Sequence, residues 1–253
     1  MTALFSAEGI SKHFGGVVAL SEMSLEVDTG EAVGLVGPNG AGKTTLFNCL
    51  LGIVRPDTGS VFFDGRRIDG LRLYKRARLG IGRTFQRLEL FSGMTVLDHL
   101  LVALRARGDG AQLWKDLVGI GGPRRSEIDT AMRVLGLVGL ADSAGAMVES
   151  LTLGHGRLLE LARAIVAGPR LLMLDEPSSG LDSAETAVLV DVLKSVRSET
   201  GAAILLVEHD LDMVSLLVEK LYVLDFGKLI AAGPIREVLA DASVRRAYLG
   251  GEQ

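Results

Sequence analysis

Residues 32–45, AVGLVGPNGAGKTT, contain the pattern that decides the fold of this chain. The apolar run at residues 32–36 predicts a buried strand, and a helical pattern starts at Thr45. Between the two stands G-x-x-x-x-G-K-[ST], the phosphate-binding loop motif, in the strand-to-helix context that it requires. Chance produces such a match in on the order of one in a hundred chains of this length. The stretch therefore predicts an α/β fold that binds a nucleoside triphosphate.

Each residue type in this loop has a task at a polyphosphate. Gly40 and Gly42 allow backbone conformations that a Cβ would penalise. The N–H groups of residues 40–44 then form an anion site at a helix N-terminus. Lys43 reaches the β- and γ-phosphates, and the Thr44 hydroxyl becomes a Mg²⁺ ligand. We expect the nucleotide to contact Gly37, Asn39, Gly40, Ala41, Gly42, Lys43, Thr44 and Thr45.

The composition narrows the class of protein. The 253 residues carry a formal charge of −4 and no long basic run, which argues against nucleic acid as a main partner. We expect no signal peptide, because residues 1–10 lack a basic start, and no membrane span, because no apolar run approaches ~20 residues. Cys49, the one cysteine, predicts a core residue in a reducing compartment. The mean hydropathy of +0.34 predicts a large core or an apolar surface that partners cover.

A long helical block divides the chain. Residues 4–27 alternate apolar and polar between glycine turns, which predicts antiparallel strands. Apolar residues then recur at helical spacing through much of residues 87–163. We expect one domain, residues 1–253, in which a helical sub-domain at 87–163 interrupts a nucleotide-binding α/β core of residues 1–86 and 164–253. The densest basic segment, residues 72–78, predicts a solvated helix face.

Strands and helices alternate in the last third of the chain. Apolar runs at 171–174 and 202–207 flank a helical pattern at 183–196, and a helix at 211–218 precedes a strand at 221–225. This order predicts a parallel sheet with right-handed crossovers. Ligands bind at the carboxyl ends of such strands, where Gly37, Asp175 and His209 fall.

Three side chains near these strand ends, and that of Gln86, suit the hydrolysis of a phosphate bond. Asp175 can hold a nucleotide's Mg²⁺ through its water shell, and Glu176 can polarise the attacking water. His209 can donate a hydrogen bond to the γ-phosphate, and the Gln86 amide could meet Mg²⁺ and water. Each has a structural alternative: Asp175 as a helix cap, Glu176 as a surface acid, and the other two as ordinary loop residues.

The ordered set of motifs resembles the nucleotide-binding subunit of ATP-binding cassette (ABC) transporters, over essentially the whole chain. The motifs are the phosphate loop at 37–44, the glutamine loop Thr84-Phe85-Gln86, a signature-like stretch at 151–155, and the segments 171–176, 179–182 and 208–210. The resemblance implies the P-loop NTPase (ABC ATPase) fold, with an N-terminal antiparallel β sub-domain and an inserted helical sub-domain. It also implies ATP and Mg²⁺ as cofactors.

The resemblance assigns a role to each candidate residue. It implies catalysis by Glu176, His209, Gln86 and Lys43, and Mg²⁺ held by Thr44, Gln86 and Asp175. In a head-to-tail dimer, the partner's Thr152 and Gly154, at a helix N-terminus, would clamp the ATP. Phe14 would stack on adenine, although its alternative is core packing. Asp182 would join the nucleotide site, although with Glu185 it also forms a capping-box pattern.

The signature departs from the usual Leu-Ser-Gly-Gly-Gln. Thr152 replaces the serine, Leu153 the first glycine and His155 the glutamine. The hydroxyl and the second glycine, Gly154, are kept, so we expect the clamp to be preserved. Gly180 stands where alanine is common in the family.

Further residues resemble the branched-chain amino acid import ATPases of the LivG type. These are Gly82-Arg83-Thr84-Phe85-Gln86, Leu90-Phe91, Met94-Thr95-Val96 and Phe14-Gly15-Gly16; the ending at 244–250, VRRAYLG, also fits but is shared with lipopolysaccharide-export ATPases. The resemblance implies a peripheral subunit on the cytoplasmic face of the inner or plasma membrane. Its partners would be transmembrane permeases, a second ATPase of the same or another kind, and indirectly a substrate-binding protein. The surface after Gln86, with Leu88, Leu90 and Phe91, would receive the permease's coupling helix.

Three alternatives remain open at this stage. An ATPase of a lipid or polysaccharide exporter is the closest rival. A cassette ATPase of DNA repair would carry a long heptad run or a CxxC, and the sequence contains neither. A ribosome-associated cassette protein normally has two cassettes, whereas each motif occurs once here.

Overall fold

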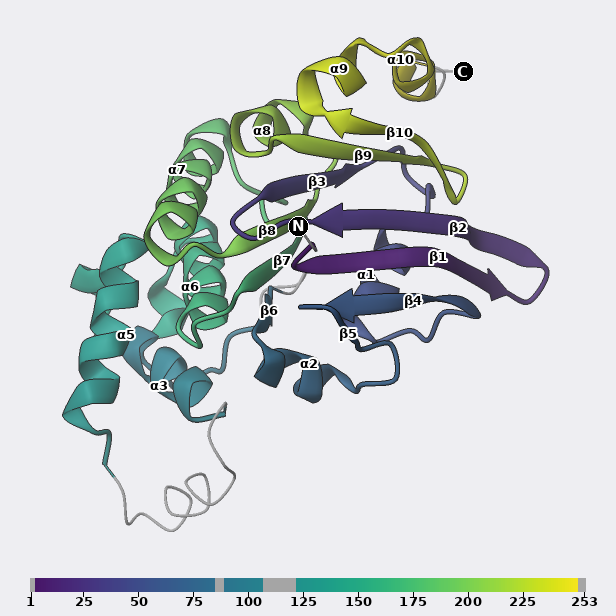
Figure 1. Ribbon diagram of the computed structural model, residues 1–253. Coiled ribbons are helices and arrows are strands. Elements are labelled where there is room, and N and C mark those ends of the chain that lie inside the picture. The colour runs from purple at the N-terminus through teal and green to yellow at the C-terminus, as the bar shows by residue number, and fades with distance from the viewer. Residues whose placement is uncertain (1–2, 85–88, 107–121, 250–253) are drawn as a thin grey trace.

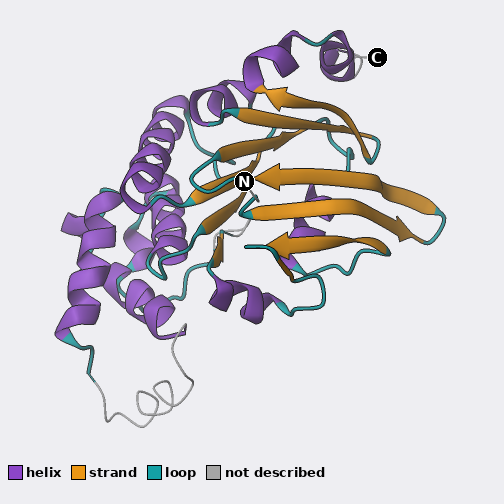
Figure 2. Ribbon diagram, viewed as in Figure 1, coloured by secondary structure: helices purple, strands orange, loops and turns teal. Residues whose placement is uncertain are grey.

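The computed structural model describes residues 3–84, 89–106 and 122–249. A six-stranded sheet and a four-stranded sheet lie against one another, helices α5–α8 lie over the far face of the six-stranded sheet, and the outer face of the four-stranded sheet has no described helix over it (Figures 1 and 2). The described part of the chain includes no helix both long and apolar enough to cross a membrane.

The six-stranded sheet has the strand order β10-β9-β3-β8-β7-β6. Strands β9, β3, β8, β7 and β6 pair in parallel, as the alternation of strands and helices predicts. Two strands of this sheet were not predicted: β6, a three-residue strand that follows Gly80 and contains Gly82, and β10, which pairs antiparallel at the edge. The strands are β3 (Ala32–Val36), β6 (Ile81–Arg83), β7 (Leu171–Asp175), β8 (Ala203–Val207), β9 (Lys220–Asp225) and β10 (Lys228–Pro234).

The antiparallel strands predicted for residues 4–27 form two strands of the four-stranded sheet. Its order is β2-β1-β4-β5, and its strands are β1 (Phe5–Phe14), β2 (Val17–Val27), β4 (Thr58–Phe63) and β5 (Arg66–Arg67). Strands β1 and β2 are longer than predicted, because irregular register positions carry the pairing past the polar and glycine residues that interrupt the pattern.

The helices follow the predicted patterns except at their ends. Helix α6 begins at Leu153 and includes Gly154 and Gly156. Helices α9 and α10, short and near the C-terminus, were not predicted. The helices are α1 (Lys43–Leu51), α2 (Leu73–Leu79), α3 (Val96–Ala106), α5 (Arg125–Leu137), α6 (Leu153–Ile165), α7 (Ser183–Thr200), α8 (Leu211–Leu217), α9 (Ile235–Ala240) and α10 (Ala242–Leu249), with single turns η1 (Ala141–Ser143) and η2 (Val148–Ser150).

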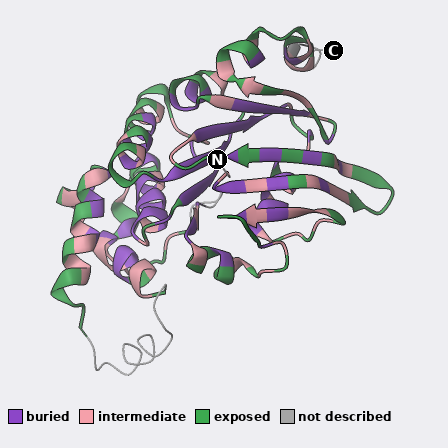
Figure 3. Ribbon diagram, in the orientation of Figure 1, coloured by how far each residue is buried: buried purple, intermediate pink, exposed green. Residues whose placement is uncertain are grey.

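The parallel strands are buried on both faces (Figure 3), which explains their unbroken apolar sequences. Successive residues of a strand point to opposite faces. Accordingly, Val33 and Leu35 of β3 join a core shared with α1 and the antiparallel sheet, whereas Ala32 and Val36 join a core shared with α3 and α5–α8. Cys49 of α1 is fully buried in the first core, as predicted, and burial raises the pKa of its thiol to about 11.

Arg76 contradicts the prediction that the basic segment is a solvated helix face. Its neighbours Arg72, Lys75 and Arg78 are exposed, but Arg76 is fully buried. The guanidinium donates hydrogen bonds to the backbone carbonyl oxygens of Leu71 at 3.0 Å, Asp69 at 3.1 Å and Leu50. Leu50 lies in the last turn of α1, where helix carbonyls lack partners within the helix. Arg76 therefore satisfies a helix end that is remote in sequence, and burial lowers the pKa of its guanidinium.

Arg76→Ala is expected to lower the free energy of unfolding by about 2–4 kcal/mol, because it leaves a cavity and buried carbonyls without donors. Urea denaturation without nucleotide measures the change. Arg72→Ala, on the exposed side of the same segment, is the matched control and should leave the midpoint unchanged. Equal, small effects of the two substitutions would contradict the structural role of Arg76.

Candidate functional site

The phosphate loop presents the start of α1 without a side-chain cap. Gly40 and Gly42 have φ values of 78° and 102°, in the region that favours glycine. A Cβ on Gly42 would lie 2.7 Å from the backbone oxygen of Ala19, so a side chain could not enter there. The first N–H groups of α1 therefore have no side-chain cap and are available to bind an anion in the loop.

Lys43 lies buried beneath the loop, against its backbone. Its Nζ donates hydrogen bonds to the carbonyl oxygens of Gly37 at 2.7 Å and Pro38 at 3.0 Å. Burial lowers the pKa of Lys43, while the charges of Glu176 and Asp175 oppose that shift. A cavity of about 390 Å³ opens beside the ammonium group, lined by residues 39–45 together with Val17, Val18, Ala19, Glu176, Phe226 and Gly227.

The two predicted acids lie where β7 ends, at the edge of the sheet that bears the phosphate loop. Asp175 is the last residue of the strand and is buried. Burial, followed by the charges of Glu176 and Glu208, raises the pKa of Asp175 to about 6. Glu176 has a φ of 47°, unusual for a residue other than glycine, and its N–H donates to the Val207 carbonyl oxygen at 2.8 Å. The strained backbone turns Glu176 into the cavity lining.

This donor set fits Mg²⁺. A buried carboxylate with two acidic neighbours favours a nearby divalent cation, and Mg²⁺ prefers carboxylate, hydroxyl and phosphate oxygens. Within the described ranges, no group of three or more His, Cys, Asp or Glu side chains could hold a metal by itself. The ion would therefore share Asp175 and the Thr44 hydroxyl with the phosphates of the nucleotide.

Glu208, which was not predicted as a site residue, connects the loops that follow β7 and β8. Its fully buried carboxylate accepts hydrogen bonds from the Ser178 N–H at 3.0 Å, the Ser178 hydroxyl at 2.6 Å and the His209 N–H at 3.1 Å. The His209 ring is exposed, with its Nδ1 3.6 Å from the second carboxylate oxygen. Glu208 thus fixes the backbone of His209 relative to the turn that begins at Glu176.

Glu208→Gln is expected to lower the rate of ATP turnover about tenfold or more with little change in ATP affinity, because an amide cannot accept hydrogen bonds at both of its ends. Steady-state kinetics and equilibrium ATP binding separate the two effects. Glu237→Gln, an exposed acid on α9, is the control. A tenfold loss of ATP affinity with unchanged turnover would contradict a role in positioning His209 and Glu176.

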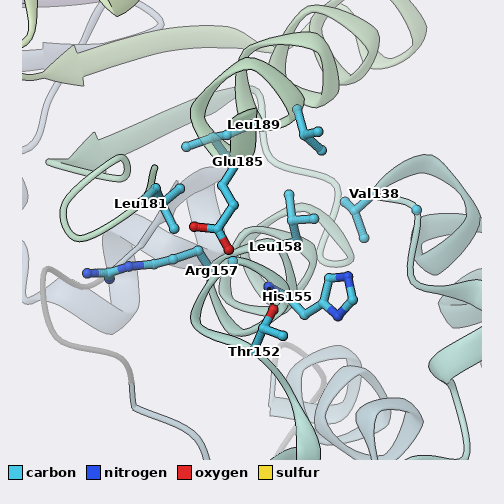
Figure 4. Close-up of a pocket in the computed structure, with 11 residues that line it drawn as sticks. Val138, Thr152, His155, Arg157, Leu158, Leu181, Glu185 and Leu189 are labelled. Carbon is cyan, nitrogen blue, oxygen red and sulfur yellow. Dashed lines mark hydrogen bonds between the residues drawn. The ribbon is translucent and has the colours of Figure 1, made fainter. Parts of the chain in front are cut away.

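The signature-like residues form the start of α6, as the sequence predicts. Thr152 is the N-terminal cap, and its exposed hydroxyl accepts a hydrogen bond from the His155 N–H at 3.2 Å. A Cβ on Gly154 would lie 2.6 Å from a carboxylate oxygen of Glu185, so the close approach of this side chain requires glycine. Figure 4 shows the Glu185 carboxylate directed from α7 toward α6, beside a cavity of about 190 Å³ that Thr152 and His155 also line.

Asp182 performs the capping role that was its structural alternative. Its carboxylate accepts from the Glu185 N–H at 2.8 Å, and the Glu185 carboxylate accepts from the Asp182 N–H at 3.2 Å. The pair is a capping box at the start of α7. A role of Asp182 at the nucleotide stays a prediction.

Comparisons with known proteins agree with this geometry. A family model described as "ABC transporter" matches residues 20–179. The high-affinity branched-chain amino acid transport ATP-binding protein LivG of Salmonella typhimurium is 39% identical over 250 residues, 98% of each chain. This chain belongs to the ABC transporter family.

Further relatives of this ABC protein cover nearly its whole length. BraF of Pseudomonas aeruginosa, also a branched-chain amino acid transport ATP-binding protein, is 38% identical over 98% of each chain. The lipopolysaccharide export ATP-binding protein LptB of Haemophilus influenzae is 34% identical, again over 98% of each. A crystal structure of the ADP conformation of an ABC transporter's ATP-binding cassette superposes with a TM-score of 0.86 at 30% identity, covering 99% of this chain and 100% of the other. The chain is an ATP-binding, ATP-hydrolysing subunit of a transporter, and the predicted fold is confirmed.

Several predicted site residues do not line the 390 Å³ cavity: Phe14, Gly37, Thr152, Gly154, Asp175, Asp182 and His209. Gln86, with Leu88, lies outside the described residues. Phe14 ends β1 with 51% of its surface exposed and carries the Lys12 ammonium 5.4 Å from its ring centre, but it does not line the 390 Å³ cavity. Val17 and Val18, across the hairpin from Phe14, do line it. Exposed valines in a strand give no distinctive signal, so the sequence did not predict them as site residues.

A buried ion pair on α6, between Arg157 and Glu160, makes hydrogen bonds to two loops of this ABC subunit. Arg157 donates to the Glu160 carboxylate at 3.2 Å and to the backbone oxygen of Ser179 at 3.3 Å, in the loop after Glu176. The Glu160 carboxylate also accepts from the Glu89 N–H at 3.1 Å, directly after the glutamine loop. Burial raises the pKa of Glu160. The pair links the loop after the candidate catalytic acid to the segment that precedes Phe91.

Proposed function

We propose that this ATPase subunit powers the import of branched-chain amino acids or related small polar solutes. The observation that carries the proposal is the identity of 38–39% to the LivG and BraF transport proteins over 98% of the chain, against 34% to the LptB export protein over the same span. The sequence around the glutamine loop, GRTFQ, supports it. The transported molecule itself would be recognised by other subunits of the transporter. The choice of solute therefore rests on the sequence identities to LivG and BraF.

For the reaction, we propose that Glu176 is the general base and takes a proton from the attacking water. Lys43 and the N–H groups of residues 40–44 hold the phosphates, while His209 donates a hydrogen bond to the γ-phosphate. The buried Glu208 supports that step, since it binds the His209 backbone and the Ser178 turn together. When bound between Thr44 and Asp175, Mg²⁺ neutralises charge that develops on the phosphates. Gln86 is proposed as a further ligand.

The exposed start of α6 supports an association with a second ATPase subunit. Thr152 presents its hydroxyl at the positive end of the helix, while Gly154 is buried beside Glu185. We propose that this surface clamps the ATP bound to the phosphate loop of a second subunit, identical or different. ATP binding then closes the pair and hydrolysis reopens it.

An apolar groove supports docking of a transmembrane permease. A cavity of about 440 Å³ lies between α2, α3 and α6, lined largely by small and apolar side chains such as Tyr74, Ala77, Ala103 and Ala167. Phe91, 54% exposed, packs its ring beside His99, at 5.8 Å between ring centres. We propose that residues 87–163 form the helical sub-domain that borders this groove. A permease helix would dock there, at the cytoplasmic face of the membrane, and a substrate-binding protein would act indirectly through the permease.

Capture of the assembled transporter tests this proposal. The Glu176→Gln variant, loaded with ATP and Mg²⁺, should stay closed long enough to be isolated from gently solubilised native membranes. Mass spectrometry is expected to find two permeases and a second, different ATPase of an amino acid importer. A self-paired ATPase with a lipid or polysaccharide export permease would contradict the import proposal. Recovery without any membrane protein would contradict a transport role.

A further inference from the structure

The turn between β9 and β10 carries a residue that its geometry does not favour. Asp225 pairs with Lys228, so Phe226 and Gly227 alone form the turn. Both have positive φ, 41° and 74°, as in the type I′ turns that join such hairpins. Asn, Asp and Gly suit the first of these positions, whereas a bulky aromatic side chain there adds backbone strain.

Burial does not compensate for this strain. The Phe226 side chain is 86% exposed and joins neither hydrophobic core. The ring therefore contributes little to the stability of the fold, whereas its positive φ adds backbone strain. A strained residue with an exposed aromatic ring indicates a functional role and not a structural one.

The turn is fixed against the phosphate loop. The Gly227 N–H donates to the Ala41 carbonyl oxygen at 2.9 Å, and the Gly227 carbonyl oxygen accepts from the Ser21 N–H at 2.8 Å. A Cβ on Gly227 would lie 2.6 Å from the Ala19 oxygen, so the backbones are in close contact. In Figure 1 the β9–β10 turn extends on the same side of the molecule as the β1–β2 hairpin. Phe226 is thus held at a defined place.

That place is the wall of the candidate nucleotide cavity. Residues 39–45 line the part of the cavity that the phosphates would take, and Val17, Val18 and Phe226 supply large apolar side chains elsewhere in its lining. Once the phosphates are bound at α1, the remaining part of ATP with a flat apolar surface is the adenine base. Aromatic rings bind such surfaces by stacking or edge contacts.

We propose that Phe226 contacts the adenine base of bound ATP and contributes to affinity for the nucleotide. The proposal rests on the assignment of the phosphate loop to the phosphates. It adds a second aromatic side chain to the one predicted at Phe14.

Phe226→Asn tests the proposal, because its two expected effects have opposite signs. Asparagine suits the positive φ, so the thermal midpoint of the nucleotide-free protein should stay unchanged or rise. The Kd for ATP should increase about threefold to tenfold, because the ring contact is lost. Calorimetry with ATP and Mg²⁺ in the Glu176→Gln background measures the Kd without turnover. Binding of inorganic tripolyphosphate, which has no base, should not change.

Controls separate this proposal from the assignment of the phosphate loop. Leu216→Ala removes a side chain that is 58% exposed on α8, away from the cavity, and should leave both affinities unchanged. Lys43→Ala should weaken ATP and tripolyphosphate alike; if it does not, the assignment of the loop fails. If Lys43→Ala behaves as expected but Phe226→Asn binds ATP normally, the Phe226 proposal is wrong. An equal loss of ATP and tripolyphosphate in Phe226→Asn, or altered self-association with normal ATP affinity, would also overturn it.

Discussion

Replacing Glu176 with glutamine is expected to lower ATP turnover at least about a hundredfold and to leave ATP binding intact. General bases contribute about 10²–10⁴-fold to rates, and glutamine keeps the size of the side chain while losing its basicity. The structure places Glu176 on a strained turn in the cavity wall, next to the buried Asp175. Phosphate release measures turnover, and calorimetry measures ATP binding.

The matched control for this substitution is Glu199→Gln, which changes an exposed acid near the end of α7. It should turn over ATP at the normal rate. If Glu176→Gln retains more than about a tenth of normal turnover, the proton acceptor is another group, since loss of a general base has a larger effect. A parallel loss of ATP affinity would show instead that the carboxylate holds the nucleotide.

Lys43→Ala is expected to raise the Kd for ATP about tenfold to a hundredfold, because a charge-assisted contact to phosphate contributes about 1.5–3 kcal/mol in a desolvated site. Lys43 is buried against the loop, with Nζ 2.7 Å from the Gly37 carbonyl oxygen, so its ammonium group already lies beside the anion site. Calorimetry with Mg²⁺ and ATP measures the Kd.

Lys194→Ala, at an exposed position on α7, removes the same charge away from the cavity and should bind ATP normally. A thermal melt of Lys43→Ala without nucleotide distinguishes a lost phosphate contact from a collapsed loop. Normal ATP affinity in the Lys43→Ala variant would contradict the assignment of this loop to the phosphates of ATP.

The features that follow from contiguous sequence were predictable. The phosphate loop is one stretch whose glycines, lysine and flanking elements occur in fixed order, and parallel strands bring Asp175 and His209 to the edge of the sheet that Gly37 occupies. The Thr152 cap and the Asp182 capping box are also local patterns of a few residues.

What the sequence did not reveal depends on partners remote along the chain. In the sequence, Arg76 looks like one of several surface cations. The α1 carbonyl oxygen that its guanidinium binds belongs to Leu50, which lies outside residues 72–78. Glu208 precedes a recognisable histidine, but its role depends on Ser178, which comes from another strand end. Phe226 reads as a hydrophobic residue near a glycine, and its exposure becomes evident once the two-residue turn is located. The sequence of β10 does not alternate between apolar and polar residues, so the strand becomes evident only from its pairing with β9.

Leucine uptake by intact cells tests the central claim most directly. Uptake of labelled leucine at low concentration should be lost when the gene for this chain is deleted, restored by the wild-type chain, and not restored by Glu176→Gln. Glu199→Gln should restore uptake fully. Leucine uptake that is unchanged by the deletion, together with defective export of a lipid or polysaccharide, would contradict the assignment to amino acid import.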